Sequence, residues 1–451
     1  MRRYKTPPSQ GLTIAKKFRY RLIPANSRRE FILWQGMGAY RSQGLAGLFK
    51  YLAGQTRGMF RRLLVEPQAR RGRRARLSAA VAEGRYTGIR DVFVILAGVP
   101  IDDTGGGARC TQLALELLRQ GSAVIYINKF PKYESSELNL TISDAHLWTY
   151  WLAEFDWKAF TWEFAALLAN KPLHALVEYP IGDFLPLISD LRHSGAILAY
   201  DLVDAWDTSL GNAWYSAEVE RQIIAASAVL VATEASLVAR LERLSGRPVV
   251  FLPNAVNSNL FGPQPEAPRP ADFPQAEWSV IYIGALWGEW FDWDLLTRIA
   301  RCYPEAAVVV VGDYRGQCPN PPSNLYFLGL KAQRSLPPYL EHADVAIIPW
   351  KVNPITQATS PLKLYEYLAM HKPVVAPELD PLRDMPGVFL TPNAEAFIAK
   401  IAEVRQAALP EEELDHFIAA NNWQARVNEL LQQIDLADGA RDSRTGSSAS
   451  G

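Results

Sequence analysis

The sequence predicts an α/β chain with two doubly wound parallel-sheet domains that face a cleft, preceded by a basic helical arm. Short apolar runs of strand length alternate with helical stretches in two successive series, which is typical of parallel sheets. GPQPEAPRPADFP at 262–274 contains five prolines and is expected to be a stiff linker between the two series. Residues 1–90 hold 21 Lys and Arg but 3 Asp and Glu, whereas the whole chain holds 47 of each kind. A basic arm therefore precedes an acidic body.

The arm comprises residues 1–88, and within it residues 11–64 alternate Arg and Lys with aromatic and aliphatic residues at spacings compatible with amphipathic helices. Such a helix suits the interface of an anionic membrane surface. The alternatives are oligomerisation, docking on an acidic partner, or packing on the acidic body; no motif supports nucleic-acid binding. No run of about 20 apolar residues and no secretory signal are present. We expect a cytoplasmic protein that is peripheral on the cytoplasmic face of the membrane.

The first domain, residues 89–261, begins with a strand, a glycine-rich turn (IDDTGGGARC), a helix (TQLALELLRQG) and a second strand. Strands are expected at 91–98, 122–127, 174–179, 196–201, 228–233 and 248–253.

The second domain, residues 275–395, repeats the alternation, and C-terminal helices (396–436) and a disordered tail (437–451) follow it. Its expected strands are 278–284, 306–312, 324–329, 343–349 and 374–376.

The segment ATSPLKLYEYLAMHKPVVAPEL (358–379) predicts a short helix that starts beside Ser360, a good N-cap residue, and Pro361. The free N–H groups of a helix start attract phosphate. Lys363 and Glu366 are three residues apart and share a face, so a cation and a carboxylate would meet the phosphates and ribose of a nucleotide. The alternative is a capped surface helix with an ordinary Lys–Glu pair.

Two further groups of residues are candidates. The glycines of Gly105-Gly106-Gly107-Ala108-Arg109 would let the backbone approach a ligand closely; the alternative is a plain tight turn. Asp201 and Asp204 follow an expected strand, and one of them could orient or deprotonate an acceptor hydroxyl. The alternative is that they cap the following loop.

No metal or other cofactor is expected. Asp292-Trp293-Asp294 has the DxD spelling of some metal sites, but we interpret it as the first turn of a helix, where acidic residues are favoured. The six His show no ligand spacing, and Cys110, Cys302 and Cys318 are scattered. GxSxG, Walker and HExxH motifs are absent.

Over residues 89–436 the chain resembles retaining, family-four-like GT-B nucleotide-sugar glycosyltransferases of the cell-envelope, teichuronic-acid or exopolysaccharide type. The order and spacing of several blocks carry the resemblance: GGGAR, AYDLVDAW (199–206), LPNAVNSNLF (252–261), YIGALWGEWFDWDLL (282–296), GLKAQRSLPPYLEHADVAIIPW (329–350) and the block 358–379.

The resemblance implies a nucleotide site on the second domain. Glu366 would hold the donor ribose, and Lys363 with the amides near Ser360 and Leu362 would face the diphosphate. Gly284 would line the same site, and Gly106, Gly107 and Arg109 would lie beside the phosphates and the acceptor. Asp204, with Asp201 as a fallback, would serve the acceptor. The first glutamate of the family's Glu-x7-Glu pattern is replaced by Ala358, and two usual basic residues by Ala285 and the Trp290-Phe291 region.

The expected activity is transfer of a sugar from a nucleotide-diphosphate donor to a glycan or lipid-linked acceptor in cell-envelope polysaccharide synthesis. The enzyme would be hexosyltransferase-like and retaining. A catalytically silent nucleotide-sugar-binding subunit is the alternative, because Ala358 lacks a carboxylate. An oxidoreductase is disfavoured because GGGAR is not GxGxxG.

Overall fold

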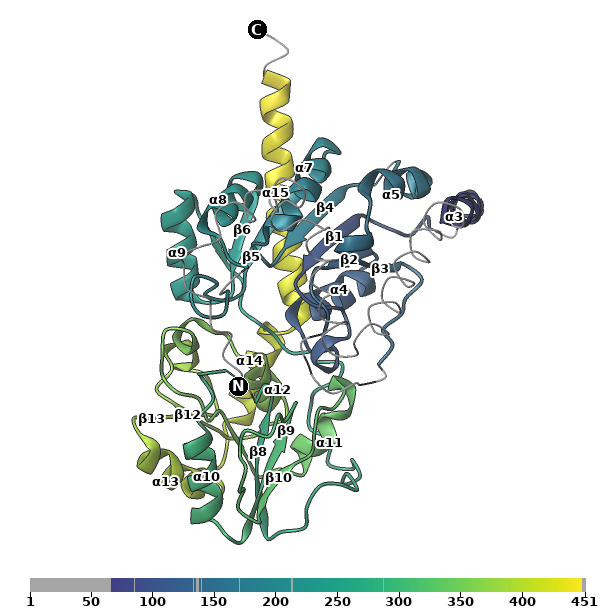
Figure 1. Cartoon of the computed structure of the whole chain (residues 1–451). Helices are drawn as coiled ribbons and strands as arrows, with labels where there is room; N and C mark the ends of the chain where they lie inside the picture. The colour runs from purple at the N-terminus through teal and green to yellow at the C-terminus, as the bar shows by residue number, and fades with distance from the viewer. Residues whose placement is uncertain are drawn as a thin grey trace, which may run out of the picture. The chain divides into compact units, whose positions relative to one another are not determined.

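A computed structural model describes most of the chain outside the basic arm (Figure 1). The described residues are 66–84, 86–132, 134, 138, 140–169, 171–211, 214–286 and 288–447. Residues 66–83 and 162–164 belong to one compact unit, and the other described residues belong to a second.

The smaller unit contains helix α3 (Glu66–Ala82). The Arg73 guanidinium donates to both carboxylate oxygens of Glu163 at 2.6 and 3.2 Å. The Arg74 guanidinium lies 4.3 Å from the centre of the Trp162 ring. The expected helical arm is therefore confirmed for residues 66–82, whereas residues 1–65 lie outside the described residues.

The first domain of the larger unit is a seven-stranded parallel sheet in the order β3-β2-β1-β4-β5-β6-β7. Its strands are β1 (Val92–Ala97), β2 (Ala123–Asn128), β3 (Leu147–Trp151), β4 (Leu173–Val177), β5 (Ile197–Leu202), β6 (Val229–Ala232) and β7 (Val250–Phe251). All six residues of β1 are buried, as expected of a central strand covered on both faces. Six expected strands are confirmed, and β3 at the sheet edge was not predicted.

Helices lie in the connections between successive strands, except that no described helix lies between β2 and β3; parallel pairing needs such crossover connections. They are α4 (Arg109–Arg119), α5 (Trp157–Glu163), α6 (Ala165–Leu168), α7 (Leu185–His193), α8 (Ala217–Ala226) and α9 (Ala235–Ser245), with short turns η2 (Asp103–Gly106), η3 (Leu152–Glu154) and η4 (Gly182–Phe184).

The second domain is a six-stranded parallel sheet in the order β10-β9-β8-β11-β12-β13. Its strands are β8 (Trp278–Ile283), β9 (Ala306–Val311), β10 (Leu325–Phe327), β11 (Val345–Ile347), β12 (Val374–Pro377) and β13 (Val388–Thr391). Five of them were expected, and the edge strand β13 was not. The two sheets confirm the predicted fold class.

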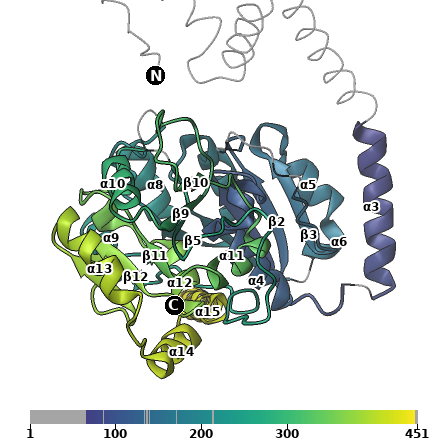
Figure 2. The same ribbon diagram turned by 90° about the horizontal axis from the view of Figure 1, so that it is seen from below.

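The second domain has its own helices, which Figure 2 shows from below. They are α10 (Trp293–Cys302), α11 (Pro337–Glu341), α12 (Leu362–Ala369), α13 (Ala394–Val404) and α14 (Glu411–Ala420), with short turns η5 (Gln333–Ser335), η6 (Thr356–Ala358) and η7 (Asp380–Leu382).

The last helix, α15 (Trp423–Ser447), returns to the first domain (Figure 1). Its apolar residues Trp423, Val427, Leu430 and Ile434 share one core with α4 and with strands of the first sheet. The expected disordered tail is wrong for residues 437–447, because the helix continues to Ser447.

Both sheets reverse their strand order at one place, between β1 and β4 and between β8 and β11. Ligands of open α/β sheets bind beyond the carboxyl ends of the strands at such a switch point. The predicted glycine loop follows β1, and Gly284 follows β8, so the fold places both at switch points.

Candidate active site

The start of α12 differs from the prediction in its cap. Pro361, not Ser360, is the N-cap residue, and no side chain bonds to the first turn. The predicted Ser360 cap is wrong because its hydroxyl accepts instead from the backbone N–H of Asn254 at 3.3 Å. The Asn254 side-chain amide also donates to the Ser360 carbonyl at 2.6 Å. The start of α12 is thus held by the last segment of the first domain, and among the described residues no side chain is hydrogen-bonded to its first amides.

Lys363 places a cation beside the second switch point. Its ammonium lies 4.5 Å from the Trp350 ring centre and 5.5 Å from that of Tyr282, distances typical of cation–π contacts. No hydrogen bond or ion pair joins it to another described residue. Burial lowers its pKa to about 8, and the charge of Glu366 opposes that shift.

Gly284 makes room for Lys363. It has φ +147°, and a Cβ built there would lie 2.3 Å from Lys363 Cε. A side chain at this position would displace the lysine stem. The structure therefore brings together two of the residues expected in the donor site.

Glu366 lies one turn along α12 and is 7% exposed. Its Oε1 accepts from Gln333 Nε2 at 2.8 Å. Burial raises its pKa to about 7, and the Gln333 hydrogen bond and Lys363 oppose that rise. Oε2 has no hydrogen-bond partner among the described residues, so this oxygen is free to accept from a ligand.

The glycine loop approaches the second domain closely. Gly105 has φ +69°, and a Cβ there would lie 2.4 Å from the Lys331 carbonyl oxygen. Gly106 has φ +84°, and its carbonyl accepts from Gln112 Nε2 at 2.8 Å. A Cβ on Gly107 would lie 3.6 Å from Gln333 Nε2. The loop therefore contacts the side chain that bonds to the Glu366 carboxylate.

Arg109 and Asp201 form a buried ion pair. Arg109 donates from Nε to one Asp201 oxygen at 2.8 Å and from Nη2 to the other at 3.2 Å. Its other N–H groups donate to the Leu252 and Pro253 carbonyls and to Asn254 Oδ1, at 3.0 to 3.2 Å. All five guanidinium hydrogens have acceptors. In this geometry Arg109 joins β5 to the segment 252–254, and no guanidinium N–H is left to donate to a phosphate.

Asp204 differs from Asp201 in both exposure and bonding. Asp201 is fully buried against Arg109, whereas Asp204 is partly exposed and its carboxylate bonds to no described residue. Burial raises the pKa of Asp204 to about 7. Of the two predicted acceptor-side acids, Asp204 is the one whose oxygens are available.

An aromatic cluster, defined by Phe130, Tyr179, Trp206 and Trp214, lies beside Asp204 at the carboxyl edge of the first sheet. The Trp206 ring centre lies 4.8 Å from that of Tyr179 and 5.2 Å from that of Trp214. Phe130 lies 6.3 Å from Trp214. Trp206 Nε1 is buried and has no hydrogen-bond partner in the described part of the chain. Sequence reasoning did not single out this cluster.

Glu178, which directly follows β4, was also missed. It is buried, and its Oε1 has no hydrogen-bond partner among the residues that the structure describes. Burial and the neighbouring Asp201 raise its pKa to about 8, Arg109 opposes the shift, and Asp204 adds to it. The signal was a glutamate at the end of an otherwise apolar run, HALVEY, beyond a strand next to the switch point.

Asp292 is the N-cap of α10, as the sequence predicts for the DxD-like triplet. Its Oδ1 accepts from the Leu295 backbone N–H at 2.9 Å. In the described part of the chain, no three His, Cys, Asp or Glu are grouped so as to hold a metal ion.

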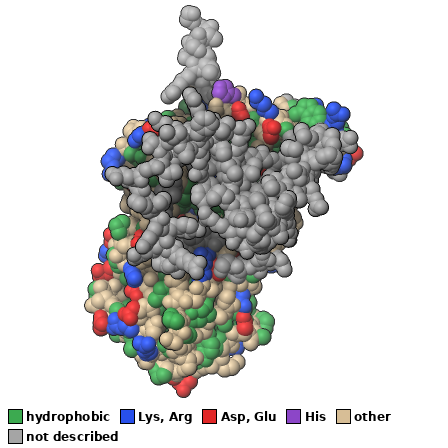
Figure 3. All heavy atoms as spheres, viewed as in Figure 1, with side chains coloured by type: hydrophobic (Ala, Val, Ile, Leu, Met, Phe, Trp, Pro, Cys, Tyr) green, Lys and Arg blue, Asp and Glu red, His purple; other side chains and the backbone are tan. Residues whose placement is uncertain are grey.

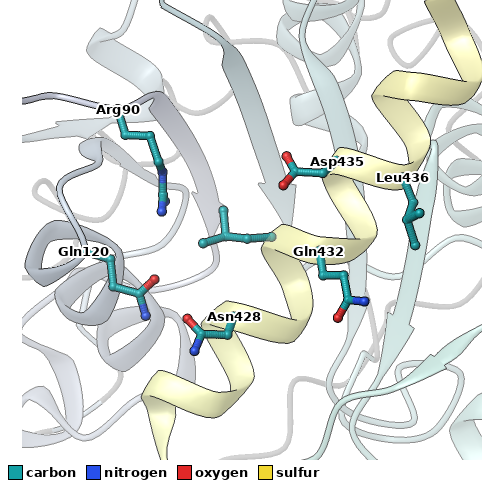
Figure 4. Close-up of a pocket in the computed structure, with 7 residues that line it drawn as sticks. Arg90, Gln120, Asn428, Gln432, Asp435 and Leu436 are labelled. Atoms are coloured by element: carbon teal, nitrogen blue, oxygen red, sulfur yellow. The ribbon is translucent and has the colours of Figure 1, made fainter.

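A cavity of about 400 Å³ lies away from these residues, between α15 and the end of α4 (Figure 4). Arg90, Gln120, Asn428 and Gln432 are among the residues that line it. Arg90 precedes β1 and Gln120 follows α4, so the cavity is at the amino edge of the sheet. The candidate site is at the opposite, carboxyl edge.

Residues 278–406, most of the second domain, match the family described as glycosyl transferases group 1. A Bacillus subtilis (strain 168) chain assigned to teichuronic acid biosynthesis as the glycosyltransferase TuaH is 28% identical over 213 residues. This match covers 43% of the present chain and 53% of that relative, about half of its length.

Two solved structures share the two-domain architecture. Sucrose-phosphate synthase from Thermosynechococcus elongatus matches with a TM-score of 0.54 at 19% identity, over 78% of this chain and all of that one. The chain has the GT-B fold. Anabaena HepE, solved in complex with UDP, matches this GT-B chain with a TM-score of 0.52 at 12% identity, over 76% and 99% of the two chains.

Proposed function

We propose that the chain transfers a sugar, of the hexose class, from a nucleoside-diphosphate donor to a glycan or lipid-linked acceptor in cell-envelope polysaccharide synthesis. The observation that carries the proposal is the position of Lys363 and Glu366, one turn apart at the start of one helix, beside the second switch point. Lys363 is a cation without an anionic partner among the described residues, and Glu366 has one free carboxylate oxygen. The match to glycosyl transferases group 1 includes this helix.

In this proposal the diphosphate binds at the first turn of α12, between the free amides after Pro361 and the Lys363 ammonium. The ribose diol donates to Glu366 Oε2. The GT-B neighbour HepE was solved with UDP, which supports a nucleoside diphosphate as the ligand class.

A thermal-shift series with UDP, GDP and ADP, followed by calorimetry, tests the donor site. A ligand that binds the native state raises the melting temperature. We expect one diphosphate to bind and its sugar conjugate to be consumed when acceptor extract is added. No shift with any of the three would contradict the proposal.

On the acceptor side we propose that Asp204 orients the attacking hydroxyl. If transfer retains configuration, the leaving diphosphate can take the proton, so a full general base is not required. The aromatic cluster would receive an acceptor sugar ring, since aromatic faces combine large contact area with rigidity. Asp204→Asn should cut transfer and Trp214→Ala should raise the acceptor KM, both with unchanged diphosphate affinity. Intact transfer in Asp204→Asn would reject this assignment.

We propose that the cation and the helix start handle the diphosphate charge without a metal cofactor. Transfer should therefore persist after dialysis against EDTA. Loss of activity that Mg²⁺ or Mn²⁺ restores would show the opposite.

A second candidate is a catalytically silent nucleotide-sugar-binding subunit of a polysaccharide assembly complex. The observation that favours it is Ala358, which is buried where the family pattern has its first glutamate. Purified chain that binds the nucleotide sugar but neither transfers nor hydrolyses it would favour this candidate. Turnover by the purified chain would exclude it.

We further propose that residues 1–88 hold the enzyme on the cytoplasmic face of an anionic membrane. No helix of the described residues is long and apolar enough to cross a bilayer. On the face of the second domain that Figure 3 shows, basic and acidic side chains are interspersed. Each arm cation near an anionic surface contributes about 1 kcal/mol.

Co-sedimentation with anionic and neutral vesicles tests the arm. The full chain should sediment with anionic vesicles at low salt, whereas a chain that begins at Gly88 should not. Equal binding of both chains, or equal binding to neutral vesicles, would contradict the membrane role.

A further inference from the structure

Three buried amide and carboxylate side chains form a continuous hydrogen-bonded chain across the two GT-B domains. Gln112 on α4 donates from Nε2 to Gln333 Oε1 at 2.8 Å, and Gln333 on η5 donates from Nε2 to Glu366 Oε1, also at 2.8 Å. Gln112 belongs to the first domain, whereas Gln333 and Glu366 belong to the second. We name this chain of Gln112, Gln333 and Glu366 the glutamine relay.

The relay has a fixed direction because Gln112 uses its whole amide. Its Nε2 also donates to the Gly106 carbonyl at 2.8 Å, and its Oε1 accepts from Asn257 Nδ2 at 3.3 Å. A flipped Gln112 would set its amide nitrogen against Asn257 and its oxygen against Gly106. Gln333 must therefore accept on its oxygen and donate from its nitrogen, toward the carboxylate.

Burial makes the relay costly to break. Gln112 is 2% exposed, and Gln333 and Glu366 are each 7% exposed. Buried polar groups that lose a partner incur their desolvation penalty. Gln333 thus holds Oε1 and leaves Oε2, the other oxygen of the Glu366 carboxylate, toward the proposed ribose.

We infer that Gln333 is a positioning residue for Glu366, and that Gln112 holds Gln333 from the opposite domain, so that nucleotide affinity depends on contact between the domains. The inference rests on the proposed donor role of Glu366. The close approach of Gly105 to the Lys331 carbonyl supports it, since the relay closes only where the glycine loop meets the segment before η5. Donor binding and domain contact are then linked through one carboxylate.

A double-mutant cycle measures this coupling. UDP, GDP and ADP are titrated into the wild type, and the diphosphate that binds is then titrated into Gln112→Leu, Gln333→Leu and the double variant. We expect each single variant to weaken binding about fivefold to tenfold, the effect of one net hydrogen bond. The double variant should lose no more than Gln333→Leu alone, because Gln112 acts through Gln333.

Ser209→Ala is the matched control, because the Ser209 hydroxyl donates to Glu289 of the second domain but has no bond to the relay. It should leave diphosphate affinity within twofold of the wild type. If a Leu variant does not fold, as judged by its melting curve, Gln112→Met and Gln333→Met replace it.

The pH dependence of binding separates positioning from general loosening. Lys363 and Gln333 are the groups that favour the ionised form of Glu366. Removal of the Gln333 donor should move the acidic limb of the affinity profile to higher pH. Unchanged affinity and an unmoved limb in Gln333→Leu would overturn the inference while leaving the proposed function intact. A wild type that binds none of the three diphosphates would overturn both.

Discussion

At the scale of single residues, the site is built from ionisable groups whose burial disfavours their charged forms. The pKa of Lys363 falls to about 8, and that of Glu366 rises to about 7. Such shifts at a switch point are typical of functional groups. They also make binding sensitive to pH within the neutral range.

Nucleoside-diphosphate affinity should follow a bell with its maximum between pH 7 and 8. Below that range Glu366 takes up a proton and accepts the ribose less well, and above it Lys363 loses its charge. Lys363→Met should remove the alkaline limb, and Glu366→Gln the acidic one. Calorimetry from pH 6 to 9 measures both.

The matching nucleoside is the control for this profile, because it lacks phosphates. It should show the acidic limb alone, and Lys363→Met should hardly change its affinity. Equal losses for nucleoside and diphosphate in Lys363→Met would mean that Lys363 acts on fold stability only.

Glu178→Gln should flatten the dependence of stability on pH. The folded-state pKa of Glu178, about 8, lies above its ordinary value of 4.5. Between these values the unfolded chain ionises while the folded chain keeps its proton, so the free energy of unfolding falls by about 1.4 kcal/mol per pH unit. Urea unfolding at pH 5 and pH 8 measures the free energy of unfolding, and the value of the variant relative to that of the wild type should be higher at pH 8 than at pH 5.

The exposed Glu277→Gln serves as its control and should follow the wild type at both values. A Glu178→Gln variant whose stability falls between pH 5 and 8 as steeply as the wild type would contradict the assignment.

Sequence patterns singled out Lys363, Glu366 and Asp204 as candidates, because helix starts and strand ends can be predicted from local sequence. The same patterns did not single out Gln112 or Gln333. A glutamine carries no local signal, and its role here arises only when two distant segments meet across the domains.

At the scale of elements, the carboxyl end of α12 is fixed by a specific backbone motif. Its carboxyl end is a Schellman motif, in which the Lys372 N–H donates to the Tyr367 carbonyl and the His371 N–H to that of Leu368. His371 has φ +51°, in the place where glycine is usual. His371 therefore carries steric strain in this left-handed conformation, because its Cβ crowds the backbone there and a glycine has no Cβ.

His371→Gly should therefore stabilise the chain by about 0.5–1 kcal/mol, since glycine adopts this conformation without steric cost. The bond from His371 to the exposed Asp415 carboxylate, 2.9 Å long, is a surface contact and contributes little. Thermal unfolding measures the gain. His371→Ala is the control, because it also loses the contact with Asp415 but keeps the strained Cβ. If His371→Gly is no more stable than His371→Ala, the backbone at this position is not strained.

Eleven strands were predicted from apolar runs, whereas β3 and β13 were not. Both are edge strands whose residues are mostly half-buried or exposed, so their sequences lack the continuous apolar run of a central strand. The predicted N-cap, Ser360, lies one residue before the observed one, because the Ser360 hydroxyl accepts from the Asn254 backbone N–H and does not cap the helix.

At the scale of the whole molecule, the buried pair of Arg109 and Asp201 ties the first domain to the second through Asn254 and Ser360. The two-domain plan was predictable because alternation repeats on either side of a proline-rich segment. The contacts between domains were not, since they depend on how loops from both sheets meet.

Arg109→Met should cost about 3–5 kcal/mol in the free energy of unfolding, because it leaves the fully buried Asp201 carboxylate without a partner. Adding Asp201→Asn should restore part of that loss. Chemical unfolding followed by fluorescence checks both. A loss no larger than that of Arg221→Met, whose partner Glu218 is exposed, would show that the buried pair is not a framework element.

Helix α15 has a consequence for how the chain is made. Trp423, Val427, Leu430 and Ile434 complete an apolar core whose other buried members lie between Phe93 and Ala255 and are translated much earlier. During synthesis one face of the first sheet therefore stays uncovered until α15 has left the ribosome. Ribosomes stalled before Trp423 should therefore carry a first domain that proteases cut readily.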